Sequence, residues 1–173
     1  LYAKSEKRNV PAICEQLFLW IVSDEYAVFD RVIPAFADAL GPDGWNELEQ
    51  LFRAQIAIIN QTPGDDNSRE LFHFVSSLLD IADLKGDVDS YIAISTEFGW
   101  NYDRQLLAIA ERLAEVGRFE ETLAWLDKMK PDSYEGYSSS RLRVRALEAL
   151  GMSEELIALR RNLVLQHLNK DAF

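Results

Sequence analysis

Cysteine is nearly absent from this sequence, because Cys14 is the only one in 173 residues and no internal disulfide can form. In the apolar run PAICEQLFLW a free cysteine is expected to behave as a small buried hydrophobe, and a chain without disulfides fits a reducing compartment. No apolar run reaches the roughly 18 to 20 residues that cross a bilayer, and no signal-peptide pattern appears. We therefore expect no membrane partner and a cytoplasmic location.

Turn-forming residues are also scarce, with five prolines and eight glycines. All-β domains need a turn signal every 8 to 12 residues, so this scarcity argues against a sandwich or a barrel. Apolar residues make up 48% of the chain, which excludes general disorder and allows a substantial core. The composition favours long helices.

Basic residues are outnumbered, at 18 Lys and Arg against 29 Asp and Glu, and the net charge is -11. A nucleic-acid-binding surface needs an excess of basic side chains on one face, so we expect no direct nucleic-acid partner. The imbalance lies mainly in residues 1–99, which hold 7 basic against 17 acidic residues. The remainder is nearly balanced, at 11 against 12, and is locally rich in arginine: Arg141, Arg143, Arg145, Arg160 and Arg161.

Motifs for catalysis and metal binding are missing. The two histidines, His73 and His167, are far apart, and there is no H-E-x-x-H, paired cysteine motif, phosphate loop, dinucleotide fingerprint or G-x-S-x-G. His73 is expected to be a partly buried helix residue, and Asp65 and Asp66 are expected to lie in a solvated loop. We therefore predict no catalytic residue, no metal site and no cofactor.

Apolar residues recur at helical spacing along the chain. The pattern predicts helices over 11–22, over 23–41 with a kink at Pro34, and over 42–59, the last two forming a hairpin with a very short turn. A loop follows at 60–69, and further helices are expected before Gly86 and over 88–99. In all we expect eight or nine helices in one domain, 1–173, with a subdivision into N-terminal helices 1–62 and repeat-like hairpins 67–173.

The stretches LKGDVDSYIAI, EVGRFEETLAW and ALGMSEELIAL share a helix end, a glycine and a polar helix start. Their glycines, Gly86, Gly117 and Gly151, lie 31 and 34 residues apart, and periods near 34 are typical of helical-hairpin repeats. We expect each glycine within two residues of a helix end, most with positive φ. The predicted inner stripe of the last two hairpins is Leu113, Leu123, Leu126, Leu147 and Leu150.

EVGRFEETLAWL resembles the turn and second helix of a tetratricopeptide repeat, with Gly117 at the turn and Phe119 two residues later. Thr122 replaces the usual alanine, and 130–140 is a longer loop than a regular array has. The resemblance implies an all-α fold of stacked antiparallel hairpins, a degenerate tetratricopeptide-like superhelix.

A wider set of strings, including SDEYAVFDRVIPAFADALGPDGWNELEQLF, KGDVDSYIAI and RLAEVGRFEETLAWLDK, resembles an uncharacterised bacterial family of helical domains. Some members of that family carry a SWIM-type zinc finger upstream. The cysteine and histidine ligands of such a finger are absent from this sequence.

These patterns favour a non-enzymatic scaffold that binds a protein or peptide through an acidic or C-terminal segment. Planar guanidinium groups suit carboxylates, so Arg104, Arg112, Arg141 and Arg145 are the predicted peptide-binding residues. Trp100, in FGWNYDR at a helix junction, is a further candidate, whereas Trp20, Trp45 and Trp125 are expected in the core. One alternative is a structural domain that packages an upstream nucleic-acid-binding module, and a less favoured one is an enzyme with an unrecognised carboxylate site. The arginines themselves have a second interpretation: they form a solvated helix face with intrahelical pairs such as Arg145 with Glu148.

Overall fold

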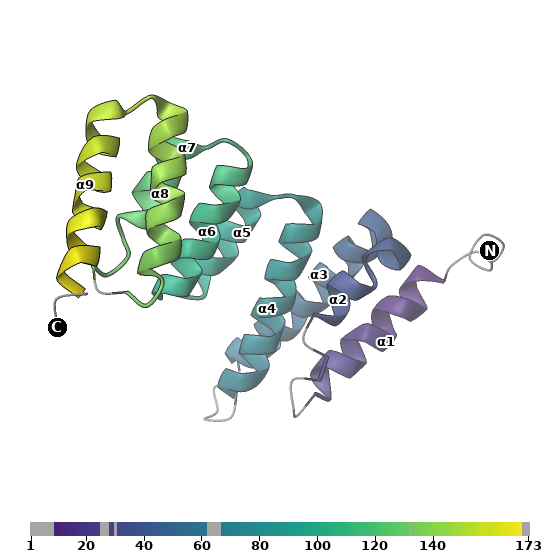
Figure 1. The fold of residues 1–173 in the computed structure, drawn as a ribbon. Coiled ribbons are helices and arrows are strands. Elements are labelled where there is room, and N and C mark those ends of the chain that lie inside the picture. The colour runs from purple at the N-terminus through teal and green to yellow at the C-terminus, as the bar shows by residue number, and fades with distance from the viewer. Residues whose placement is uncertain (1–8, 25–27, 30, 62–66, 132, 171–173) are drawn as a thin grey trace. The chain divides into compact units, whose positions relative to one another are not determined.

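The computed structural model describes residues 9–24, 28–29, 31–61, 67–131 and 133–170, with the side chains of 67–69 and 166–170 excepted. The described residues form helices and contain no strand (Figure 1). None of these helices has the length and apolar character needed to span a membrane. The nine helices are α1 (Val10–Val22), α2 (Val32–Ala35), α3 (Ala37–Gln61), α4 (Asn67–Lys85), α5 (Val88–Glu97), α6 (Asp103–Glu115), α7 (Phe119–Leu126), α8 (Gly136–Leu150) and α9 (Ser153–Lys170).

The prediction for the three repeated glycines is confirmed. Gly86, Gly117 and Gly151 follow α4, α6 and α8 within two residues and have φ of 64°, 79° and 70°. At each one the next residue's N–H donates to the carbonyl five residues earlier, as in Arg118 N to Leu113 O at 2.8 Å. This is the Schellman arrangement, in which a left-handed residue satisfies the last carbonyls of a helix. The three glycines therefore mark three equivalent helix ends.

The predicted helix over 23–41 is confirmed only at 32–35 and 37–40. Near its predicted start the Asp24 carboxylate accepts hydrogen bonds from the backbone N–H groups of Val28 (3.0 Å) and Phe29 (2.7 Å). Arg31 follows in a left-handed conformation with φ 67°, and the helix α2 then lasts only four residues. The helical stripe read from the sequence is thus interrupted by local hydrogen bonds and a left-handed residue.

The predicted start at Pro42 is nearly correct, because Gly41 has φ 60° and separates a short first turn of α3 from the long helix after it. The hairpin predicted between this helix and the one before it is wrong. The long part of α3 packs mainly against α1 and α4, and only marginally against α2.

The chain divides into two compact units, residues 1–98 and 99–173. The subdivision predicted from the sequence falls elsewhere, at 62–67, between α3 and α4. These two helices pack together within the first unit. The predicted loop residues Asp65 and Asp66, and the side chain of His167, lie outside the described residues.

In the first unit the core is built from α1, α3 and α4. Phe18, Phe52 and Phe74, one from each helix, place their ring centroids 5.6 to 6.3 Å apart. Cys14 is fully buried, as predicted, and its Sγ lies 3.5 Å from the carbonyl of Gly44. Helix α4 packs against α1, α2, α3 and α5.

One side-chain network joins three helices of this unit. Glu49 on α3 accepts from Lys85 of α4 at 2.6 Å and from Arg53 at 3.1 Å. Arg53 also lies 3.7 Å from Glu97 at the end of α5. Partial burial raises the pKa of Glu49, but the hydrogen bonds from Lys85 and Arg53 outweigh it, so the pKa is lowered overall.

In the second unit each helix packs chiefly against its neighbour in the sequence. The small Ala110 and Ala114 are buried where α6 meets α7 and α8, as their size predicted. The inner stripe is confirmed in part. Leu113, Leu126 and Leu147 are buried, whereas Leu123 and Leu150 are only half-buried and the stripe is narrower than expected.

Candidate functional site

Two of the predicted arginines form the strongest surface feature of the second unit. Arg141 and Arg145 are one turn apart on α8, both exposed, and each guanidinium lies over an aromatic ring. The Arg141 Cζ is 5.9 Å from the centroid of Tyr137, and the Arg145 Cζ is 6.0 Å from that of Phe119 at the start of α7. We call Phe119, Tyr137, Arg141 and Arg145 the arginine–aromatic face.

The carboxylate pairing expected for these arginines is not found. Glu148, the predicted partner of Arg145, forms its ion pair with Arg160 of α9 instead. Arg143 lies between Arg141 and Arg145 on α8, and its Nη1 is 2.6 Å from Oδ1 of Asp127. Among the described residues no carboxylate lies within ion-pair distance of Arg141 or Arg145. No described carboxylate therefore neutralises the positive charge of these two arginines.

Arg145 differs from Arg141 in its anchoring. Its Nη2 donates to the carbonyl oxygen of Ala114, in the last turn of α6, at 3.4 Å. A cation at a helix C-terminus is stabilised by the orphan carbonyls there. Arg145 is thus held between α6 and α7 and has a structural contact of its own, whereas Arg141 contacts a ring that is itself 74% exposed.

The other three candidates are divided between the two ends of α6. Arg112 lies in its last turn, the end that Arg145 contacts, and its Nη1 donates to Ala108 O at 2.8 Å. Arg104 is exposed in the first turn, near Trp100, which is half-buried with its ring 6.3 Å from that of Tyr102. Arg112 therefore lies toward the end of α6 that Arg145 contacts, and Arg104 and Trp100 lie at the opposite end.

Sequence reasoning missed the aromatic part of this face. Tyr137 lies in the segment 130–140, which was predicted to be a loop. That prediction is wrong, because α8 begins at Gly136 and the hydroxyls of Ser139 and Ser140 donate to the Gly136 carbonyl inside the helix. Had the helix been started there, the i, i+4 spacing of Tyr137 and Arg141 would have indicated the contact.

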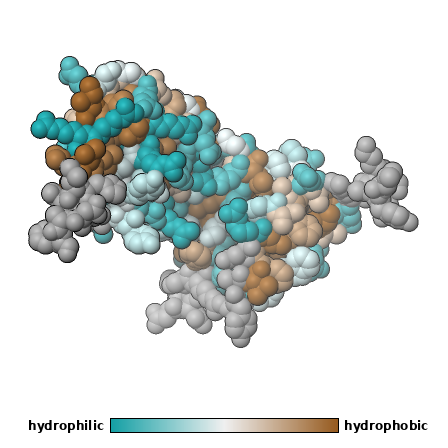
Figure 2. Space-filling view, viewed as in Figure 1, coloured by the Kyte–Doolittle hydropathy of each residue, from teal (hydrophilic) through white to brown (hydrophobic). Residues whose placement is uncertain are grey.

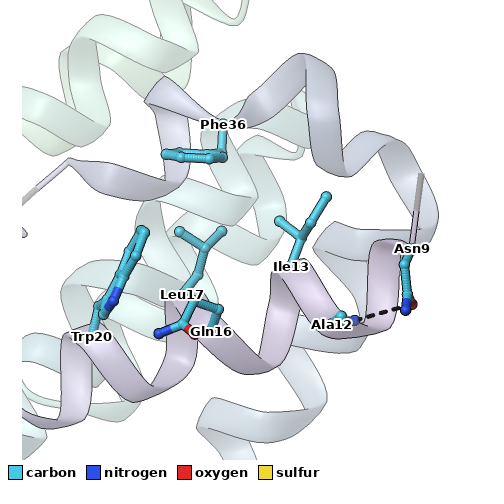
Figure 3. Close-up of a pocket in the computed structure, with 7 residues that line it drawn as sticks. All are labelled: Asn9, Ala12, Ile13, Gln16, Leu17, Trp20 and Phe36. Carbon is cyan, nitrogen blue, oxygen red and sulfur yellow. Dashed lines mark hydrogen bonds between the residues drawn. The ribbon is translucent and has the colours of Figure 1, made fainter. Parts of the chain in front are cut away.

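The first unit offers a separate, apolar groove of about 430 Å³ (Figure 3). Ile13, Leu17 and Trp20 project from α1 toward Phe36, and Asn9, Ala12 and Gln16 complete the lining. Of these residues, Trp20 was expected in the core. Only Leu17 is buried, so Ile13 and Trp20 are left half-exposed along this groove.

No group of three or more His, Cys, Asp or Glu side chains capable of holding a metal ion occurs among the residues that the structure describes. Burial, with a smaller contribution from the charge of Glu47, raises the pKa of the Cys14 thiol to about 11, so it is protonated at neutral pH. His73 is half-buried on α4, as predicted.

No curated protein and no solved structure matches this chain significantly. A protein-family model, described as a family of unknown function (DUF6880), matches residues 2–173, and the chain belongs to this family.

Proposed function

We propose that this protein is a non-enzymatic helical scaffold that binds an acidic peptide or protein segment at the arginine–aromatic face. The observation that supports the proposal is the pair Arg141 and Arg145, which lie over aromatic rings without a carboxylate partner among the described residues. In a chain of net charge -11, exposed cations would be expected to find intramolecular carboxylates. Arg118, Arg143 and Arg160 do so.

The proposed chemistry is carboxylate recognition by guanidinium. A guanidinium presents a planar fork of donors that matches a carboxylate through two parallel hydrogen bonds. A ring beneath it restrains its motion and reduces the entropy lost on binding. Tyr134, fully exposed, and Tyr137 add aromatic surface at the start of α8 for the apolar part of the segment.

The helix arrangement of the second unit suits this role, and we further propose that α6–α9 are degenerate tetratricopeptide-like hairpins. Supporting observations are the equivalent glycine-ended helices at Gly117 and Gly151, 34 residues apart, and the packing of each helix against its sequence neighbour. Such hairpins use exposed helix faces for recognition.

The test is binding of a fluorescein-labelled peptide that contains several glutamates and a free C-terminal carboxylate, followed by fluorescence anisotropy. An amidated peptide with glutamine at the same positions is the matched ligand control. We expect the acidic peptide alone to bind, with affinity falling as salt is raised. A double Arg141→Ala, Arg145→Ala variant should bind at least about tenfold more weakly, since each charge-assisted hydrogen bond contributes roughly 1.5 kcal/mol or more.

The matched protein control is the double Arg141→Lys, Arg145→Lys variant, which preserves net charge and removes the planar forks. It should recover only part of the affinity. Equal binding of the glutamate and glutamine peptides, or full affinity in the alanine variant when its circular dichroism is normal, would contradict the proposal.

A further inference from the structure

Helix α9 carries large apolar residues on two opposite sides. Leu156, Leu159 and Leu163 are half-buried on the side that packs against α8, as expected. The opposite side also carries large apolar residues: Ile157 is 68% exposed, Val164 59% and Leu165 49%. Large apolar side chains gathered on one exposed side of a helix are typical of a surface that another protein covers.

The position of this face is visible in both views of the molecule. In Figure 1, α9 lies beside α8 at the end of the second unit, and no other described helix lies on its outer side. Figure 2, viewed the same way, shows hydrophobic and hydrophilic residues next to one another over this helix. The outer face therefore combines apolar and charged residues, and the charged residues indicate which kind of partner it would bind.

Two of those charges, of opposite sign, lie two helical turns apart on the outer side of α9. Glu154 is in the first turn and Arg161 is seven residues later, both exposed and on the same side as Ile157. Neither residue has an ion-pair partner among the described residues. At 1.5 Å per residue the two lie about 10 Å apart along the helix.

We propose that the outer face of α9 binds the same face of a second copy of this chain, with the two helices antiparallel. A two-fold axis between Ile157 and Ala158 brings Glu154 of each copy opposite Arg161 of the other. Ile157 of each copy then packs against the small Ala158 of its partner. Such a contact is self-complementary, as an isologous dimer interface must be.

Charge also favours this face over the rest of the surface. Two copies of net charge -11 repel each other wherever acidic surfaces meet. The α9 sequence holds two glutamates against two arginines and one lysine, a net of +1. Association through the first half of α9 therefore avoids the repulsion while covering Ile157. The arrangement is independent of the arginine–aromatic face, because none of its residues belongs to that face.

Charge reversal tests the antiparallel pairing directly. The parent protein, measured by sedimentation equilibrium over a dilution series, should approach twice the monomer mass of 19.8 kDa as its concentration rises. Glu154→Arg and Arg161→Glu should each be monomeric at the same concentrations, because each places like charges opposite one another. An equimolar mixture of the two variants should form dimers again, since every pair in the mixed dimer is then Arg against Glu.

A second pair of variants controls for the apolar contribution and for folding. Ile157→Asp should abolish the dimer, whereas Ile58→Asp, at a similarly exposed isoleucine of α3, should leave it intact. All four variants should retain the helical circular dichroism of the parent, because each site is exposed. A parent protein that stays monomeric at every concentration overturns the proposal, as do dimeric single charge variants or a mixture that remains monomeric.

Discussion

Replacing Leu126 with alanine tests the packing of the second unit. Leu126 on α7 is 2% exposed and lies in a cluster with Leu107, Ala110, Ala114 and Leu142, covered by the half-buried Phe119, Trp125 and Met129. The substitution removes about three buried carbon groups, or roughly 2.4 kcal/mol of transfer free energy at about 0.8 kcal/mol each. A residual cavity adds to this loss, and measured core substitutions of this kind range from about 2 to 5 kcal/mol.

We expect a value of about 3 kcal/mol, in the lower part of that range, because the unbranched Met129 side chain can move into part of the space. The measurement is urea unfolding followed by far-ultraviolet circular dichroism, with the second transition fitted separately if the two units unfold independently. Leu123→Ala is the matched control, since Leu123 lies on the same helix but is only half-buried, and it should lose about 1 kcal/mol. Equal losses for the two variants would show that α7 packs through a different side.

Three further predictions follow from helix ends and the charged network. Gly151→Ala should destabilise by about 1 to 2 kcal/mol from backbone strain alone, because φ is 70° and an added Cβ meets no atom within 4 Å; an unchanged melting temperature would contradict this. Asp87→Ala should cost about 1 kcal/mol in urea unfolding, because its carboxylate accepts from the Ser90 N–H at 2.9 Å and caps α5. Glu49→Gln should remove stability at neutral pH. Because the folded pKa of Glu49 is lowered, its contribution is present above the ordinary value of 4.5 and lost as pH falls further, so parent and variant should converge in acid; a constant difference would argue against the network.

Helix ends could be predicted where the backbone demanded a specific residue. Gly86, Gly117 and Gly151 were predictable because a left-handed turn strongly favours glycine, and the Asp87 cap because a carboxylate before a helix satisfies its free N–H groups. The segment 23–41 was not predictable from periodicity. Its apolar spacing fits a helix, but Asp24 binds backbone N–H groups in a turn, and this competition between local hydrogen bonds leaves no signature in the hydrophobic pattern.

The candidate site was predictable in its residue type but not in its partners. The arginine-rich composition of 141–145 indicated a positive strip, and Arg141 and Arg145 share a side of α8 as their spacing requires. Which charges would be neutralised depended on contacts distant in sequence. Asp127 on α7 takes Arg143, and Arg160 on α9 takes Glu148. Spacing rules within one helix cannot predict such pairings, because the two partners lie on different helices.

The aromatic cluster of the first unit has a consequence for the order in which the chain folds. Phe18, Phe52 and Phe74 meet in one core, so α1 and α3 have no complete partner surface until α4 has been synthesised. During translation α1 and α3 therefore wait with apolar surface uncovered, which is the condition under which nascent chains aggregate or recruit chaperones. The second unit joins each helix to the one just made, so its contacts are local and form quickly. The slower and more vulnerable step thus belongs to the first unit, and it ends when α4 has been made.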